Sequence, residues 1–229
     1  MTPPFHYRTC ADVLRRAGNV SPDRVLVERL SAPPTRRDLI REFEPTARMY
    51  ELVDGILVEK LLHFGNAARF MQLMGPLANH VFDCNAGMLV GGKTLLRLSP
   101  TLVRIPSLCL LLWESQDDPQ VLVSSTSEFL DAVPDLIVEI VDERHTADEL
   151  RIKREEYSAA GVKLLWYYDP EARTVTVYPK GRTRGSKVLT DADTLDGGKV
   201  LPGFTLPVAD MFASRVPPNL PKKPKKKGK

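Results

Sequence analysis

Apolar and polar residues alternate along the middle of the chain in a way that predicts a strand, a helix and a second strand. Residues 136–141 (LIVEIV) and 162–168 (VKLLWYY) are short and rich in β-branched and aromatic residues, as buried strands are. Between them, Thr146 and Glu149 have the spacing of a helix capping box, and Gly161 supplies a stop. A helix is therefore expected from Thr146 to Gly161.

The pattern on either side predicts further strands and helices. Asp54–Gly55, between two apolar arms at 49–60, predicts a hairpin. The other expected elements are short helices at 11–17 and 37–42 capped by Thr9 and Thr35, a helix at 63–83 that Pro76 should bend or break, three or four strands at 87–114 with the last buried on both faces, a polar loop at 116–127, and a strand at 174–178 that pairs back as a hairpin. The fold class predicted is α+β around a mixed sheet, with accessory helices at 1–45, one main domain at 46–213 and a lysine-rich tail at 214–229.

Composition narrows the class of protein. With 43% hydrophobic and 27% charged residues, the chain can bury one core. No apolar run approaches the roughly 20 residues of a membrane span, so a cytoplasmic protein without membrane contact is expected. Three widely spaced cysteines, Cys10, Cys84 and Cys109, indicate neither a disulfide framework nor a zinc site.

The positive charge of the chain belongs to its tail. Without the six lysines that follow Pro217, the net charge changes from +3 to −3. A tail of this composition should be disordered, and it either keeps the protein in solution or attracts nucleic acid through its charge. The candidate nucleic-acid-binding residues are Lys222, Lys223, Lys225, Lys226 and Lys227.

Glu139 lies among apolar residues in the first predicted strand, where an ionised side chain is costly unless it is paired or binds a cation. One interpretation is an ion pair with a nearby lysine or arginine. The other is a metal ligand in phosphodiester hydrolysis, which needs a second acidic ligand. Asp135 is roughly 13 Å away along a strand at about 3.3 Å per residue. A second ligand must therefore come from another strand.

Lys153 lies in the helix that follows Glu139 and could return its ammonium group towards that carboxylate. There it could stabilise the charge on a phosphate or orient the attacking water. The alternative is an exposed lysine that pairs with Glu149 or Glu156 along the same helix.

A longer set of motifs resembles a known family. PDLIVEIV, the Thr-x-x-Glu box, KREEYSAAGVKLLWYYDPEARTVTVY, LPGFTLPVADMF and the earlier YELVDGILVEK are similar, in order and spacing, to the Uma-two family of restriction endonucleases. The resemblance covers about Tyr50 to Phe212. It implies a nuclease fold of the PD-(D/E)XK superfamily: a restriction-endonuclease-like core with a mixed sheet flanked by helices. It also implies Mg²⁺ or Mn²⁺ as cofactor, DNA as partner and a possible homodimer.

Carried over to this sequence, the resemblance assigns a catalytic and metal-binding role to Glu139 and a catalytic role to Lys153. The family's other metal-binding aspartate aligns with Ser107, a degenerate position, and Glu59 is a candidate to compensate. At the start of the first long helix, His63 and Asn66 are weak substitutes for the Glu or His of related proteins. The expected function is a metal-dependent endonuclease that hydrolyses DNA, impaired by Ser107. The alternative is an inactive nuclease-fold module that binds nucleic acid or another partner.

Overall fold

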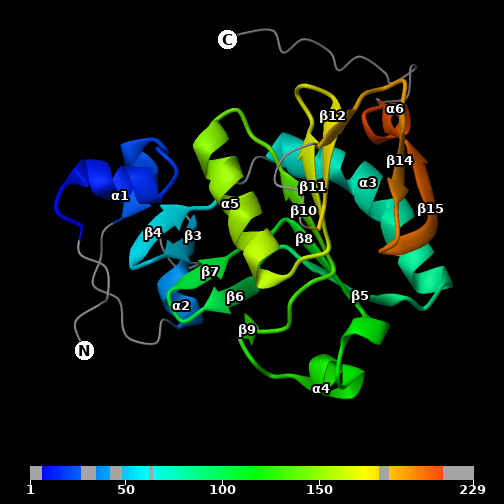
Figure 1. The fold of residues 1–229 in the computed structure, drawn as a ribbon, viewed down its shortest axis with the longest axis horizontal. Coiled ribbons are helices and arrows are strands. Elements are labelled where there is room, and N and C mark those ends of the chain that lie inside the picture. Colours follow the sequence, from blue (N-terminus) through cyan, green and yellow to red (C-terminus); the bar gives the residue numbers. More distant parts are fainter. Residues whose placement is uncertain (1–6, 27–34, 42–47, 62–63, 181–185, 214–229) are drawn as a thin grey trace, which may run out of the picture.

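The computed structural model describes residues 7–26, 35–41, 48–61, 64–180 and 186–213. Within them the chain forms two larger mixed sheets and a short two-stranded sheet, with helices packed on the sheets (Figure 1). The α+β class expected from the sequence is confirmed. The lysine-rich tail and His63 lie outside the described residues.

The six-stranded sheet is built around the predicted strand–helix–strand stretch. Strands β10 (Leu136–Ile140) and β11 (Leu164–Asp169) run parallel in register, with Glu139 opposite Tyr167, and helix α5 (Ala147–Ala160) connects them. Every residue of β8 is buried, as its continuous apolar sequence predicts. The strand order is β13 (Lys187–Leu189), β12 (Thr174–Pro179), β11 (Leu164–Asp169), β10 (Leu136–Ile140), β8 (Leu108–Leu112) and β5 (Gly87–Gly91).

The seven-stranded sheet contains the predicted hairpin, in which β3 and β4 pair across the Asp54–Gly55 turn. Two short strands from the first part of the chain extend it, since β1 pairs with β4 and β2 pairs with β3. Its order is β1 (Val25–Leu26), β4 (Ile56–Glu59), β3 (Arg48–Val53), β7 (Leu102–Arg104), β6 (Leu95–Ser99) and β9 (Phe129–Leu130), with β2 (Ile40–Arg41) beside β3.

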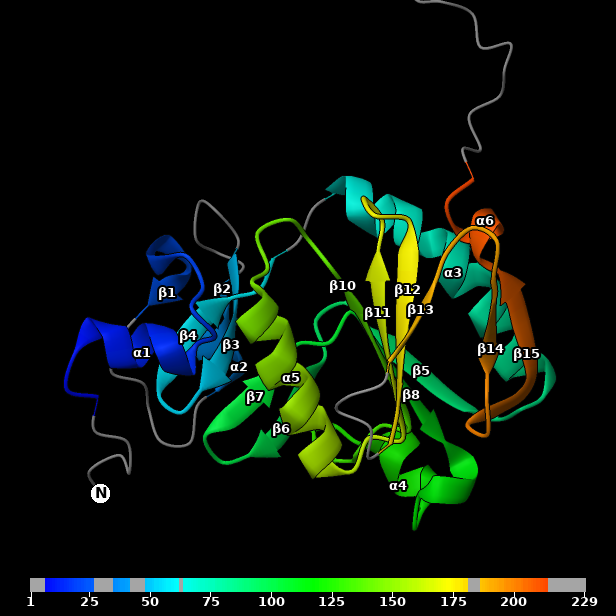
Figure 2. The same cartoon turned by 45° about the horizontal axis from the view of Figure 1, so that its top comes forward.

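Helices cover both faces of the six-stranded sheet. Leu136 and Val138 of β10 pack in one core with α3 (Phe64–Asp83), whereas Ile137 packs in another with Tyr157 of α5 (Ala147–Ala160). Figures 1 and 2 show α3 and α5 on opposite sides of β10 and β11. Because side chains alternate along a strand, Glu139 shares the α5 face with Ile137.

The remaining elements complete these layers. The two-stranded sheet packs with α3 and contributes Phe204 and Leu206 to the core on that face. The other elements are α1 (Cys10–Arg16), a 3₁₀ turn at Pro22–Arg24, α2 (Arg36–Leu39), a 3₁₀ turn at Trp113–Ser115, α4 (Pro119–Ser124), β14 (Thr194–Gly197), β15 (Leu201–Pro207) and α6 (Val208–Met211).

The helix expected at 37–42 is shorter in the structure, where α2 ends at Leu39 and Ile40–Arg41 forms β2. Two further details differ from the pattern-based expectation. Helix α3 continues through Pro76, so the break does not occur; tertiary packing of Leu73 and Leu77, both fully buried, holds the helix on either side. The segment 116–127 is not only a loop, because Asp118 accepts hydrogen bonds from the first turn of α4 and Pro119 occupies its first position. In the part of the chain that the structure describes, no helix has the length and apolarity needed to cross a membrane.

Candidate active site

Glu139 lies on β10 beneath α5 and is 2% exposed. Its Oε2 is 2.6 Å from the Nζ of Lys60, and its Oε1 accepts a hydrogen bond from the hydroxyl of Tyr157 at 2.7 Å. Lys153 Nζ is 3.6 Å from the same Oε1. Of the two interpretations of Glu139, the ion pair is therefore present in the structure.

Ser107 and Lys153 reach Glu139 from different elements. Ser107 precedes β8; its Oγ accepts from the Ile140 amide at 3.1 Å and donates to Glu139 Oε2 at 3.4 Å. Lys153 comes from the second turn of α5 and is 1% exposed, so it is not the exposed helix lysine of the alternative interpretation. The three residues that the sequence assigns to the site thus lie together, while their roles stay predictions.

Glu51 is a second buried carboxylate beside this group. It lies on β3, and its Oε2 is 2.9 Å from both Lys153 Nζ and Arg104 Nη1. Its Oε1 accepts from the Ile105 amide at 3.0 Å and from Lys153 at 3.0 Å. Glu51 is therefore engaged by three donors: the Lys153 ammonium, the Arg104 guanidinium and the Ile105 amide.

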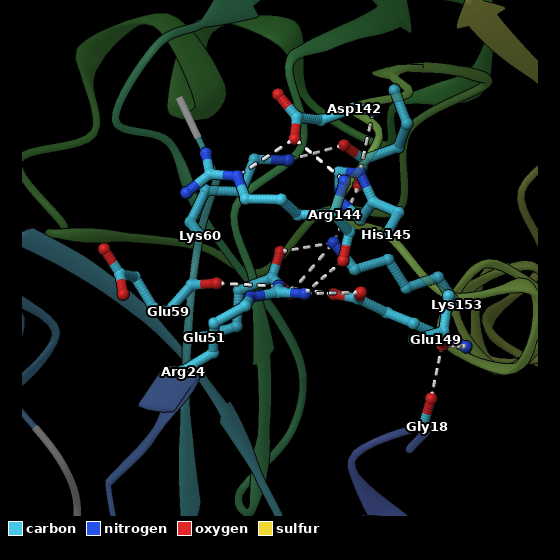
Figure 3. Close-up of polar contacts among 12 residues, drawn as sticks. Gly18, Arg24, Glu51, Glu59, Lys60, Asp142, Arg144, His145, Glu149 and Lys153 are labelled. Atoms are coloured by element: carbon cyan, nitrogen blue, oxygen red, sulfur yellow. Dashed lines mark hydrogen bonds and ion pairs between the residues drawn. The ribbon is translucent and has the colours of Figure 1, made fainter. Parts of the chain in front are cut away.

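Ion pairs link the charged side chains of this cluster, formed by Glu51, Lys60, Arg104, Glu139 and Lys153, to one another and to Glu156. Arg104 also pairs with Glu156 of α5 at 2.5 Å. The three cations of Lys60, Lys153 and Arg104 thus face the three carboxylates of Glu51, Glu139 and Glu156. Figure 3 shows the side chain of Lys153 reaching from its helix towards Glu51.

The ion pairs outweigh burial in setting the ionisation of these groups. Burial alone would raise the pKa of Glu139, but Lys153 and Lys60 hold that pKa below its usual value. Burial would also raise the pKa of Glu51, which Lys153 and Arg104 lower. For Lys153, burial lowers the pKa and the two glutamates raise it to a net value above normal. Burial raises the pKa of Tyr157 well above normal, so its phenol stays protonated and donates to Glu139.

The donor set does not fit the divalent cation that the fold family implies. Mg²⁺ needs several oxygen ligands, mostly charged or polarised, at about 2.0–2.1 Å. Glu139 has its two oxygens engaged by Lys60 and Tyr157, and Ser107 offers only a neutral hydroxyl. Among the described residues, no group of three histidine, cysteine or acidic side chains is arranged to hold a metal ion.

The other candidates from the sequence lie around the cluster without joining it. Glu59 pairs with Arg48 at 3.7 Å, and in Figure 3 its carboxylate points away from Lys153, so it does not replace an aspartate at Ser107. Asn66 contacts Asp142 at 3.4 Å. Asp135 accepts from the Leu112 amide at 2.8 Å at the entrance to β10.

A short loop after β10 carries a partly buried histidine. The Asp142 amide donates to His145 Nδ1 at 2.9 Å, and the Asp142 carboxylate pairs with Arg144 at 3.1 Å (Figure 3). Burial, with Lys153 and Lys60 nearby, lowers the pKa of His145 to about 4. The ring is therefore neutral at pH 7.

Sequence reasoning missed three members of the cluster, Glu51, Lys60 and Arg104, and also Tyr157, whose hydroxyl donates to Glu139. Glu51 carried a usable signal, because YELV places a carboxylate between apolar residues of a strand just as LIVEI does. Lys60, Arg104 and Tyr157 carried none, since a lysine or arginine at a strand end and a tyrosine in a helix are common in surface positions.

Comparison with solved structures identifies the fold of the chain. The chain is similar to a protein from Anabaena variabilis described as a "putative nuclease belonging to DUF820", with a TM-score of 0.61, 14% sequence identity, and coverage of 72% of this chain and 89% of that one. The two chains therefore share a nuclease-type fold.

Residues 33–209 match the family Uma2, whose description reads "Putative restriction endonuclease". This match spans most of the chain, so the protein belongs to the Uma2 family, as its motifs predict, and membership supports a nuclease-type function. A search among curated proteins finds no match.

Proposed function

We propose that this chain is a nuclease-fold protein that binds nucleic acid and in which metal-dependent hydrolysis of DNA phosphodiesters is impaired. The observation that carries the proposal is the engagement of Glu139: Lys60 and Tyr157 occupy its two oxygens at 2.6 and 2.7 Å. Ser107 adds no negative charge where the family's aspartate is expected. Membership of a restriction-endonuclease family supports nucleic acid as the binding partner.

A second candidate, an endonuclease that cleaves DNA, is favoured by one observation. Ser107 Oγ and Lys153 Nζ lie 3.4 and 3.6 Å from the Glu139 carboxylate, so the three positions expected in such a site are in contact. In that case the Lys153 ammonium would stabilise negative charge on the phosphate. A cleavage assay separates the two candidates.

The cleavage assay uses supercoiled plasmid and Mn²⁺ with the native chain, Glu139→Ala and Lys153→Ala, and each variant is first shown to be folded by circular dichroism because both residues belong to the buried cluster. We expect the native chain to nick plasmid no faster than Glu139→Ala, because the carboxylate is held by lysines. Nicking by the native chain that both substitutions abolish would contradict the proposal and establish the endonuclease.

Nucleic-acid binding is tested separately by fluorescence anisotropy with a labelled DNA duplex. The variant for comparison replaces the six tail lysines with glutamine in the full chain. We expect the tail variant to bind DNA more weakly than the native chain but still measurably. Its affinity should fall as the salt concentration rises, because contacts to phosphates release counterions. Complete loss of binding would confine the interaction to the tail and contradict a DNA-binding domain. A cytoplasmic location and a homodimer stay predictions of the sequence.

A further inference from the structure

Lys60 is the least expected member of the cluster. It follows β4, and its ammonium is 2.6 Å from Glu139 Oε2, with the two side chains only 3% and 2% exposed. A lysine buried in this way needs a strong counter-ion, and Glu139 provides it. Its position at the end of the hairpin is fixed by a backbone bond from the Lys60 amide to the Met49 carbonyl at 2.8 Å.

The Lys60 ammonium contacts the Glu139 oxygen, Oε2, that a metal ion bound by Glu139 and residue 107 would use. Oε1 faces Tyr157 and Lys153, so Oε2 is the oxygen nearest to Ser107, the position of the family's second acidic ligand. A divalent ion bound between Ser107 and Oε2 would meet the Lys60 ammonium at the same oxygen. Like charges at that separation repel strongly between side chains as buried as these.

The neighbouring carboxylate does not offset this repulsion. Glu51 is held by Lys153, Arg104 and the Ile105 amide, and releasing it would leave buried cations unpaired. Ser107 and Lys60 both make the site less favourable for a divalent cation. Serine at position 107 removes the negative charge of the family's aspartate, and Lys60 adds a positive charge.

We propose that the Lys60 ammonium is the resident cation of this site and takes the place of a divalent metal ion at Glu139. The inference rests on the proposed function only in treating this cluster as the counterpart of the family's metal site. It assigns to Lys60 the charge neutralisation that a metal would otherwise supply, and it predicts that removing Lys60 while restoring the acid recreates a metal site.

The test measures Mn²⁺ binding without DNA, by calorimetric titration of the full chain. The variants are Lys60→Met, Ser107→Asp and the double substitution, with Lys199→Met as the matched control on an exposed lysine. We expect that neither the native chain nor Lys199→Met binds Mn²⁺ through Glu139. Any weak binding they show should therefore be unchanged by Glu139→Ala. The double variant should bind one Mn²⁺ at least about tenfold more tightly than either single variant, because it gains a charged ligand and loses a competing cation.

Two results would overturn the inference. One is stoichiometric Mn²⁺ binding by the native chain that Glu139→Ala abolishes. The other is a double variant that folds, by circular dichroism and gel filtration, yet binds Mn²⁺ no better than the native chain. If the double variant does not fold, titrations of the native chain and of Ser107→Asp decide the question: stoichiometric Mn²⁺ binding by either chain, with Lys60 still in place, would overturn the inference. Because no DNA is present, failure here is distinct from failure of the proposed nucleic-acid binding.

Discussion

Glu51 and Glu139 show how two buried carboxylates are kept ionised. Each is almost fully buried, and each contacts Lys153, with Arg104 added for Glu51 and Lys60 for Glu139. Removing one partner of such a pair leaves a buried charge, which typically costs about 3–5 kcal/mol. The cluster is therefore a condition of folding as well as a candidate site.

The lowered pKa of Glu51 predicts acid sensitivity. Lys153 and Arg104 hold its folded-state pKa below the ordinary value of 4.5, so the stabilisation is complete above about pH 4.5 and is lost as the pH falls towards the folded value. Urea unfolding between pH 3 and 7 should show a falling free energy of unfolding below pH 4.5, and Glu51→Gln should make that fall shallower. Parallel curves for the native chain and the variant would contradict the assigned pairing.

His145 predicts a second window at higher pH. Its pKa of about 4 is below the usual 6.5, so the unfolded chain binds more protons between these values and stability falls as the pH drops through them. The shift from 6.5 to about 4 corresponds to at most about 3.4 kcal/mol, at 1.36 kcal/mol per unit. Protonation would also break the bond from the Asp142 amide to Nδ1. In urea unfolding, His145→Asn should flatten the slope between pH 6.5 and 4; an unchanged slope would exclude His145 as its cause.

At the scale of elements, the N-terminal segment holds the helix that carries Lys153. Arg24 is bidentate to Glu149 of α5 at 2.8 and 2.9 Å, both buried, and Gly18 with a φ of 86° lies against the Glu149 backbone. Only half of the capping box expected at Thr146 and Glu149 is therefore formed. Thr146 Oγ1 accepts a hydrogen bond from the Glu149 amide, but the Glu149 carboxylate binds Arg24 (Figure 3).

Arg24→Met should lower the free energy of unfolding by about 3 kcal/mol, because it leaves Glu149 buried and unpaired. Urea denaturation measures the change, and Glu149→Gln provides the second arm of a double-mutant cycle. The double variant should lose clearly less than the sum of the single losses. Additive losses would mean that the pair does not tie the segment to α5.

The sequence predicts most elements near the centre of the fold and fewer at its edges. The strand, helix and strand at 136–169 are specified by β-branched runs, by Thr146 and by Gly161, which adopts a φ of 105° at the helix end. Strands β1 and β2 have only two residues each, too short for a periodic signal. Pro76 indicates a break by itself, but the burial of neighbouring leucines overrides it.

At the scale of the whole molecule, the site joins two sheets. Glu139 belongs to the six-stranded sheet, whereas Glu51 and Arg104 belong to the seven-stranded one and Lys60 directly follows its strand β4. Motif resemblance could bring Ser107, Glu139 and Lys153 together because they share one sheet and its crossover helix. The position of one sheet relative to the other depends on the whole core. Local sequence patterns therefore could not predict that Lys60 and Arg104 lie close to Glu139 and Glu51.

Whether Lys60 or a metal ion occupies the site at Glu139 can be seen in a crystal structure of the native chain soaked in Mn²⁺, with anomalous differences collected at the manganese edge. If Lys60 takes the place of a metal ion, Glu139 shows no anomalous peak and Lys60 Nζ stays near 2.6 Å from Oε2. A manganese peak at about 2.2 Å from a Glu139 oxygen, with Lys60 displaced, would contradict it.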